Sequence, residues 1–307
     1  MFSYRHAFHC GNHADVLKHT ALLAVLNYMT EKAVGITVLD SHAGAGLYRL
    51  DGQYARTSQE SDEGVLRLLQ AQQNKEVEFA PALENYLNLL KTGNPPDAPV
   101  LNYPGSPLLV QSQLRPMDRL KAFELHPTDG RLLAGTVRRL GCGRQVEVVR
   151  DNGFSCITKF FPPPTRRGLL VCDPSYEMKT DYAQVLDLVA EGLLKFATGT
   201  YFVWYPIIAR ADAHDLPKRL RTMANRAGKN WLDMGLTIKG AAPTRQYQAP
   251  EFAEKPEEGK RVGGLPGSGV FVINPPYTLK DQMKPALEQM VSLLGQDKNA
   301  MFKLESN

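Results

Sequence analysis

Residues 168–176 read GLLVCDPSY, and this stretch decides the expected fold of the chain. Its first five residues form a short apolar run, which predicts a buried strand. The tetrapeptide Asp-Pro-Ser-Tyr at 173–176 then places a carboxylate, a carbonyl and an aromatic ring at the end of that strand. Ligands of open α/β sheets bind at this end of the strands. The stretch therefore predicts an α/β domain with a site at the carboxyl edge of its sheet.

Further strand patterns lie on both sides of this one. Apolar and β-branched runs predict strands at 36–40, 120–123, 146–150, 200–205, 234–238 and 269–274. Together with the strand at 168–173 they predict a Rossmann-like sheet of seven strands. Near the start of the chain, Asn12 can cap a helix in which Leu17, Ala21 and Ala24 recur at helical spacing. Residues 240–267 are rich in Gly, Pro, Glu and Lys, which predicts a mobile surface loop.

A helical insertion is expected between the first two strands. In nucleotide-binding folds the second strand ends in an acid about 20 residues after the glycine turn, but Glu60, Asp62 and Glu63 at that distance lack strand character. Glu124, at the end of the run 120–123, is the better candidate. Apolar residues at helical spacing fill the gap, namely Leu66, Leu69, Leu83, Tyr86, Leu87 and Leu90. We therefore expect residues 52–103 to form a small helical subdomain inserted into one domain made of 1–51 and 104–307.

Composition indicates what kind of protein this is. With 307 residues and 43% hydrophobic content, the chain can bury a large core. A net charge of +4 fits a polyanionic partner without requiring one. The four cysteines, Cys10, Cys142, Cys156 and Cys172, form no Cys-x-x-Cys pair, so a reducing cytoplasm is expected. The apolar stretch 21–26 is too short for a signal segment or a membrane span, which predicts a soluble protein with no membrane contact.

A cofactor site is predicted beside the first strand. The turn Gly44-Ala45-Gly46 follows that strand and lets a ligand approach the backbone closely. Arg49 stands where nicotinamide enzymes need a third glycine, which disfavours hydride chemistry. Glu124 and Asp151 end the next two strands, where carboxylates can accept hydrogen bonds from ribose hydroxyls and an adenine amino group. A ligand-free glycine turn and solvated strand ends remain the alternatives.

Asp173 and its neighbours suit the methylation of an amino group on a base. The Asp173 carboxylate and the Pro174 carbonyl can accept the two amino protons and leave the nitrogen lone pair free to attack a methyl sulfonium. Tyr176 offers a ring on which an extruded base can stack. The alternative is an ordinary Asp-Pro turn. The tetrapeptide Asn274-Pro275-Pro276-Tyr277 is a second match, but it follows the last predicted strand, and we interpret it as structural.

The amino terminus concentrates polar and aromatic side chains. A zinc site is disfavoured because no cysteine pair or second ligand cluster completes one, so we expect no metal. Contact with nucleic acid or cofactor is the other interpretation. The residues concerned are Tyr4, Arg5, His6, His9, His13 and His19. Basic groups elsewhere could hold phosphates or form solvated faces, and they are Arg138-Arg139, Arg166-Arg167, Lys218-Arg219-x-Arg221 and Lys260-Arg261.

Four segments together resemble one known family. They are Ser3-Tyr4-Arg5-His6-x-Phe8-His9-x-Gly11-Asn12-His13-Ala14-Asp15-Val16-Leu17-Lys18-His19, Leu39-Asp40-x-His42-Ala43-Gly44-Ala45-Gly46, Tyr103-Pro104-Gly105-Ser106-Pro107 and Asp173-Pro174-x-Tyr176-Glu177-Met178-Lys179. This combination resembles the bacterial RlmJ family of 23S ribosomal RNA adenine-N6 methyltransferases, over nearly the whole chain. The resemblance implies a class I methyltransferase fold, S-adenosylmethionine as cofactor, and a monomer that modifies protein-free ribosomal RNA.

The resemblance also implies roles for individual residues. It implies Asp173 as the catalytic carboxylate, with Pro174 and Tyr176 beside it, and substrate contact from Tyr4, to which we add His6. The cofactor contacts that we expect are Lys18, His19, His42, Gly44, Ser106, Glu124, Asp151 and Asn152. Ser106 could instead cap a helix before Pro107.

Two departures from the family pattern leave alternatives open. Asn152 follows Asp151 where the family has glycine, and Ser175 replaces the second proline of the tetrapeptide. We expect activity to be retained. A DNA adenine-N6 methyltransferase fits the motifs nearly as well, although the insertion looks small for a target-recognition domain. A catalytically weakened RNA-binding protein is the third interpretation.

Overall fold

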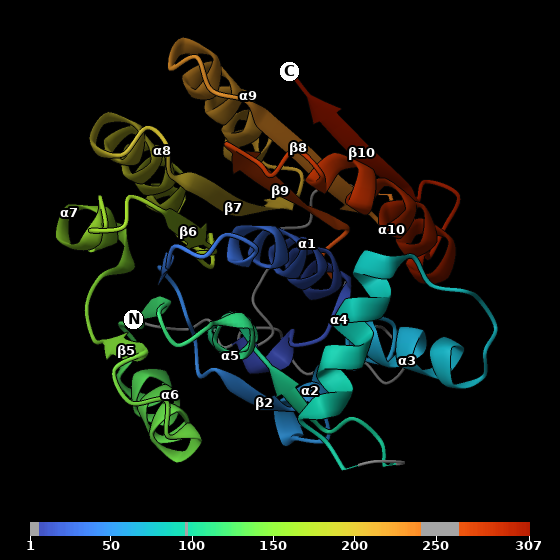
Figure 1. Ribbon diagram of the computed structural model, residues 1–307. Helices are drawn as coiled ribbons and strands as arrows, with labels where there is room; N and C mark the ends of the chain where they lie inside the picture. Colours follow the sequence, from blue (N-terminus) through green and yellow to red (C-terminus); the bar gives the residue numbers. More distant parts are fainter. Residues whose placement is uncertain (1–5, 96–97, 241–263) are drawn as a thin grey trace.

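The computed structural model describes residues 6–95, 98–240 and 264–307, and its centre is a sheet of eight strands (Figure 1). In chain order the strands are β1 (Thr37–Asp40), β4 (Arg119–Phe123), β5 (Val146–Val149), β6 (Gly168–Cys172), β7 (Thr200–Ile207), β8 (Trp231–Thr237), β9 (Gly267–Ile273) and β10 (Met301–Ser306). In space their order is β10-β8-β9-β7-β6-β1-β4-β5. The strands from β7 to β5 run parallel, whereas β9, β8 and β10 pair antiparallel with their neighbours. The Rossmann-like α/β fold is confirmed.

All seven predicted strands are present, but the predicted number is wrong because β10 adds an eighth. β10 pairs antiparallel with β8 along the sheet edge. Phe302 and Leu304 pack partly buried against the core. Lys303 Nζ lies 2.6 Å from Oδ2 of Asp233, a fully buried carboxylate in β8. A buried charge needs a partner, and β10 supplies it.

Two groups of helices cover the sheet. The buried side chains of α1 (His13–Thr30), α5 (Ser106–Gln113) and α10 (Leu279–Leu294) lie in one apolar cluster. Those of α7 (Cys156–Phe160), α8 (Lys179–Lys195) and α9 (Ala211–Arg226) lie in another. The predicted cap of α1 is confirmed, because Asn12 Oδ1 accepts hydrogen bonds from the backbone of Ala14 and Asp15. Within the described ranges, no helix has the length and apolar character that spanning a membrane requires.

The segment between β1 and β4 holds helices and a small second sheet. β2 (Leu47–Arg49) pairs antiparallel with β3 (Asn102–Pro104). Between them lie α2 (Gln53–Ser58), α3 (Val65–Gln73) and α4 (Pro81–Thr92). Their buried side chains belong to the same apolar cluster as α1 and α10. A separate subdomain at 52–103 therefore stays a prediction.

The second tetrapeptide match lies far from the carboxyl edge of the parallel strands. β9 runs antiparallel to β7, and Ile273 pairs with Tyr201 near the start of β7. Asn274 therefore lies at the amino edge of the sheet. Its Nδ2 donates to the carbonyl oxygens of Ala197, at 3.0 Å, and Gly199, at 2.7 Å. These contacts agree with the structural role predicted for Asn274.

Some predictions fall outside the described residues. They concern Tyr4 and Arg5, most of the loop predicted at 240–267, and the pair Lys260-Arg261.

Candidate cofactor and substrate site

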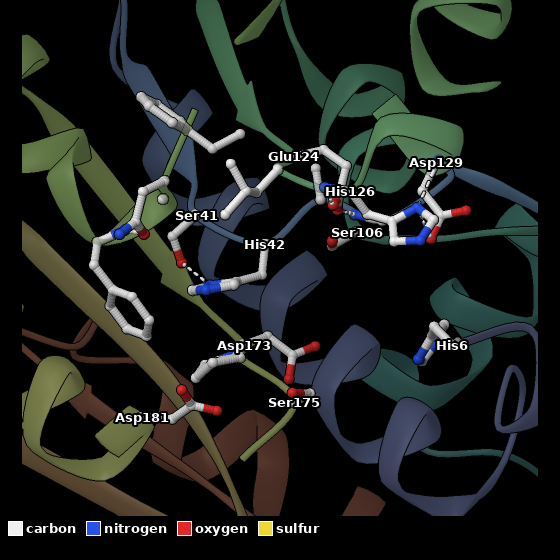
Figure 2. Close-up of a pocket in the computed structure, with 18 of the residues that line it drawn as sticks. His6, Ser41, His42, Ser106, Glu124, His126, Asp129, Asp173, Ser175 and Asp181 are labelled. Carbon is white, nitrogen blue, oxygen red and sulfur yellow. Dashed lines mark hydrogen bonds and ion pairs between the residues drawn. The ribbon is translucent and has the colours of Figure 1, made fainter. Parts of the chain in front are cut away.

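A cavity of about 320 Å³ opens at the carboxyl ends of β1, β4 and β6. Its volume is in the range typical of small-molecule sites. Figure 2 shows Asp173, Glu124, His42 and Ser106 around this cavity, each carried by a different segment. The predicted site residues that line it are His6, Lys18, His42, Gly44, Ser106, Glu124, Asn152, Asp173 and Pro174. Three predicted residues, His19, Asp151 and Tyr176, do not line it.

A buried ion-pair network holds Asp173. Lys18 Nζ lies 2.6 Å from Asp173 Oδ2 and 2.9 Å from Asp15 Oδ1. Only 5% of the Lys18 side chain and 2% of the Asp15 side chain are exposed. Burial disfavours the charged forms, yet His6 and the Lys18 ammonium hold the pKa of Asp15 well below its usual range. The Lys18 ammonium is thus fixed between two carboxylates and orients the one at the end of β6.

Tyr176 anchors the loop after β6 and offers no free ring face. The ring is 2% exposed and lies 4.7 Å from the Tyr182 ring, measured between centroids. The Tyr176 hydroxyl donates to the Trp204 carbonyl at 2.6 Å, and Arg210 Nη1 donates to the Tyr176 carbonyl at 3.2 Å. These contacts hold Tyr176 at φ 55°, a left-handed conformation. The stacking role expected for this ring does not fit its burial.

Glu124 ties the glycine turn to the end of β4. Its Oε2 accepts a hydrogen bond from the Gly44 N–H, and its Oε1 accepts one from the His126 N–H, both at 2.7 Å. Gly44 has φ +63°, and a Cβ there would lie 2.3 Å from the Tyr48 hydroxyl oxygen. Burial raises the pKa of Glu124. One carboxylate therefore shapes the turn and also faces the cavity.

We expect Glu124→Ala to weaken binding of S-adenosylmethionine by roughly 10- to 100-fold. The substitution removes the cavity carboxylate and leaves the N–H groups of Gly44 and His126 without their acceptor, at a cost of about 1–3 kcal/mol each if they stay buried. Isothermal titration calorimetry measures the affinity, and urea denaturation measures the free energy of unfolding. An affinity equal to that of the wild type would exclude Glu124 from the cofactor site.

Ser106 hydrogen-bonds to the acid that ends β1. Its hydroxyl donates to Asp40 Oδ2 at 2.7 Å. The alternative role of Ser106 as a helix cap is wrong, because Gly105 is the N-cap and Ser106 is the first residue of α5. Asp40 is fully buried, and its Oδ1 has no hydrogen-bond partner among the described residues. Burial raises the pKa of Asp40 to about 7.

Asp40 predicts a pH-dependent stability difference. The folded-state pKa of Asp40 lies above the value of about 3.9 expected in the unfolded chain. The contribution of Asp40 to the free energy of unfolding is therefore fully present below about pH 4, and it is lost as the pH rises through 7. Asp40→Asn keeps an acceptor for Ser106 but cannot ionise. We expect the melting temperature of the variant, relative to that of the wild type, to rise between pH 5 and pH 8. Thermal unfolding at several pH values measures this difference. A difference that falls over this range would contradict the raised pKa of Asp40.

The loop after β5 closes the other end of the cavity. Asn152 Oδ1 accepts from the Phe154 N–H at 3.0 Å, and the Phe154 ring meets the His42 ring edge-to-face at 4.8 Å. A Cβ on Gly153 would lie 1.7 Å from the Ser41 carbonyl oxygen, so only glycine fits there. Asp151 is instead 46% exposed and forms an ion pair with Lys159.

His19 lies behind the cavity wall. It is fully buried, and its Nδ1 is 2.9 Å from the Tyr103 hydroxyl. Burial lowers its pKa to about 3, which leaves the ring neutral. His6 and His9 contact Asp15 and Glu60 respectively, each at 3.0 Å. Over the described ranges, no group of three or more His, Cys, Asp or Glu side chains is placed to hold a metal ion.

Several cavity residues were not singled out from the sequence. Asp181 and Gln184 on α8, together with Phe154, also line the cavity. The signal for Phe154 was its position just after a strand-ending acid. Asp181 and Gln184 lie eight and eleven residues beyond Asp173 on a helix, and no local pattern separates them from solvated helix positions.

Comparison with known proteins shows the family of this chain. Residues 33–305 match the family model described as "Ribosomal RNA large subunit methyltransferase D, RlmJ". Ribosomal RNA large subunit methyltransferase J from Escherichia coli is 37% identical over 96% of this chain and 94% of that protein. The protein with the same description from Haemophilus influenzae is 35% identical over 99% and 98%. The crystal structure of protein LPL1258 from Legionella pneumophila has a TM-score of 0.78 at 30% identity and covers 97% of this chain and 98% of that one. This chain therefore belongs to the RlmJ family of ribosomal RNA large subunit methyltransferases.

Proposed function

We propose that this protein transfers a methyl group from S-adenosylmethionine to the N6 amino group of an adenine in 23S ribosomal RNA. The observation that carries the proposal is the placement of Asp173 and Pro174 in the wall of a cofactor-sized cavity, with Lys18 fixing the carboxylate. Family membership supports the same reaction class.

The cavity residues fit this cofactor. Glu124 can accept hydrogen bonds from ribose hydroxyls, and His42 and Phe154 provide aromatic surface near the end of β5. Ser106 lines the cavity, and its hydroxyl is oriented by the fully buried Asp40 behind it. The lining thus combines carboxylates, a hydroxyl and aromatic surface, which suits a nucleoside joined to an amino acid.

The arrangement at Asp173 explains how the weakly nucleophilic N6 amino nitrogen of adenine can attack a methyl group. S-adenosylmethionine supplies an electrophilic methyl group on a sulfonium. The Asp173 carboxylate and the Pro174 carbonyl accept the two N6 protons and orient the nitrogen lone pair. As the nitrogen–carbon bond forms, the sulfur–carbon bond breaks and the amine loses one proton. Asp173 is the nearest carboxylate to accept that proton in our proposal. Lys18 holds the carboxylate in position throughout.

The partner and cellular setting follow from the substrate. We propose that the protein acts as a monomer on 23S ribosomal RNA before ribosomal proteins cover the target, and that it does so in the cytoplasm. His6 lines the cavity on the side of the amino terminus, which supports the substrate contact proposed for it. A substrate contact from Tyr4 is proposed from the family resemblance alone.

Two measurements test the function. Thermal unfolding with and without S-adenosylmethionine tests cofactor binding, since a ligand that binds only the folded state raises the melting temperature. Transfer of tritiated methyl to naked 23S ribosomal RNA and to DNA, followed by mapping of N6-methyladenine, tests the substrate. Transfer to DNA alone would favour the DNA methyltransferase. RNA binding with neither stabilisation nor transfer would favour a silent RNA-binding protein.

A further inference from the structure

A row of arginines follows one edge of the molecule. Residues 131–150 contain five arginines and a single carboxylate, Glu147. All five are exposed. They are Arg131, Arg138 and Arg139 on α6 (Pro127–Leu140), Arg144 in the loop after it, and Arg150 directly after β5. We call these five residues the arginine stripe.

The charge of the arginine stripe is not neutralised within the protein. Glu147, the carboxylate of this segment, forms its ion pair with Lys121. Among the described residues, no carboxylate forms an ion pair with Arg138, Arg144 or Arg150. Arginines elsewhere are engaged, as Arg115 with Asp118 shows. The stripe therefore presents guanidinium groups to solvent.

The arginine stripe starts at the rim of the cavity. His126 and Asp129, at the start of α6, line the cavity itself. Arg150 packs beside the first turn of α6, since a Cβ on Gly130 would lie 3.8 Å from its Cγ. α6 has 14 residues, which at 1.5 Å per residue extend for about 20 Å. β5 is the edge strand of the sheet, so α6 and β5 border solvent together (Figure 1).

Helix electrostatics explain only part of the pattern. Arg138 and Arg139 lie in the last turn of α6, where a cation interacts favourably with the helix dipole. Arg131 lies in the first half of the helix, and Arg144 and Arg150 lie outside it. For these three the dipole offers no gain, so helix electrostatics do not account for their position.

We propose that the arginine stripe binds the phosphate backbone of helical ribosomal RNA next to the target adenosine. Guanidinium groups match phosphate oxygens in bidentate geometry. Such contacts position the nucleic acid without reading its sequence, and they give binding a strong salt dependence. The inference rests on the proposed function and adds the path of the RNA, which leaves the cavity over α6 and β5.

The test removes three charges that make no intramolecular ion pair. The stripe variant carries Arg138→Gln, Arg144→Gln and Arg150→Gln. The control variant carries Arg226→Gln, Lys280→Gln and Lys298→Gln, which remove three exposed charges that likewise make no ion pair among the described residues and lie outside the arginine stripe. Filter binding measures the affinity of each protein for naked 23S ribosomal RNA between 50 and 200 mM salt. Methyl transfer gives kcat and KM, and thermal unfolding with S-adenosylmethionine checks the fold and cofactor site.

We expect the stripe variant to bind RNA about 10- to 100-fold more weakly, with a salt slope shallower by about one for each lost phosphate contact. Its KM for RNA should rise with kcat and cofactor stabilisation unchanged, and the control should change much less. Equal losses in both variants would show a general charge effect and overturn the inference, as would an unchanged affinity in the stripe variant. RNA binding that depends on the stripe without any methyl transfer by the wild type would refute the proposed function alone.

Discussion

Replacing Asp173 by alanine should lower the rate of methyl transfer at least about 10³-fold, because the amine then loses the carboxylate that orients it and accepts its proton. Lys18 keeps its contact with Asp15, at 2.9 Å, so the fold should survive. The melting-temperature rise caused by S-adenosylmethionine should persist. Asp173→Asn keeps one acceptor oxygen without the charge, and its rate should lie between those of the alanine variant and the wild type. Single-turnover transfer of tritiated methyl to 23S ribosomal RNA measures these rates.

Asn274→Ala is the matched control, because Asn274 belongs to the tetrapeptide that resembles the methylase motif more closely. It should lose the hydrogen bonds to Ala197 and Gly199 and place alanine at φ 53°, so we expect a stability loss of about 1–3 kcal/mol. The rate per folded molecule should stay close to that of the wild type. If Asn274→Ala abolished transfer while Asp173→Ala retained it, the site would have to move to the opposite edge of the sheet.

The strands of the sheet could be predicted because their signals are local. β6 and β7 are largely apolar runs, and β1, β4 and β6 end directly in an acid or are followed by one. β10 has six residues, more than β1 or β6, but its Lys303 faces Asp233, 70 residues away. No local pattern reveals that partnership. The eighth strand was therefore missed although Phe302 and Leu304 alternate with polar residues.

The site could be predicted in its position but not in all its members. The carboxyl ends of β1, β4 and β6 meet at one edge, so His42, Glu124 and Asp173 could be expected together. Which side chains turn into the cavity depends on contacts elsewhere. Lys159 draws Asp151 outward, and Trp204 and Tyr182 bury Tyr176. Competition of this kind is decided by tertiary packing, which spacing along the sequence does not encode.

Lys18→Met should destabilise the protein by about 3–5 kcal/mol, the usual cost of removing one partner of a buried ion pair. Among the described residues, Asp15, with 2% of its side chain exposed, would keep His6 at 3.0 Å, the Gly11 N–H at 2.9 Å and the more distant His19 at 3.9 Å. Asp173 would lose the ammonium that orients it, so methyl transfer should also fall. Urea denaturation of the wild type and the variant measures the difference in the free energy of unfolding.

Two control variants separate the loss of the buried ion pair from the loss of a lysine in general. Lys159→Met breaks the exposed pair with Asp151, in which both side chains are at least 40% exposed, and should cost less than about 1 kcal/mol. Lys18→Met combined with Asp15→Asn removes the more deeply buried of the two carboxylates that lose their partner, and it should recover a large part of the lost stability. It should not recover methyl transfer, because Asp173 would still lack its ion-pair partner Lys18. Recovery of both would mean that Lys18 serves only the fold, whereas recovery of stability alone would separate its role at Asp15 from its role at Asp173.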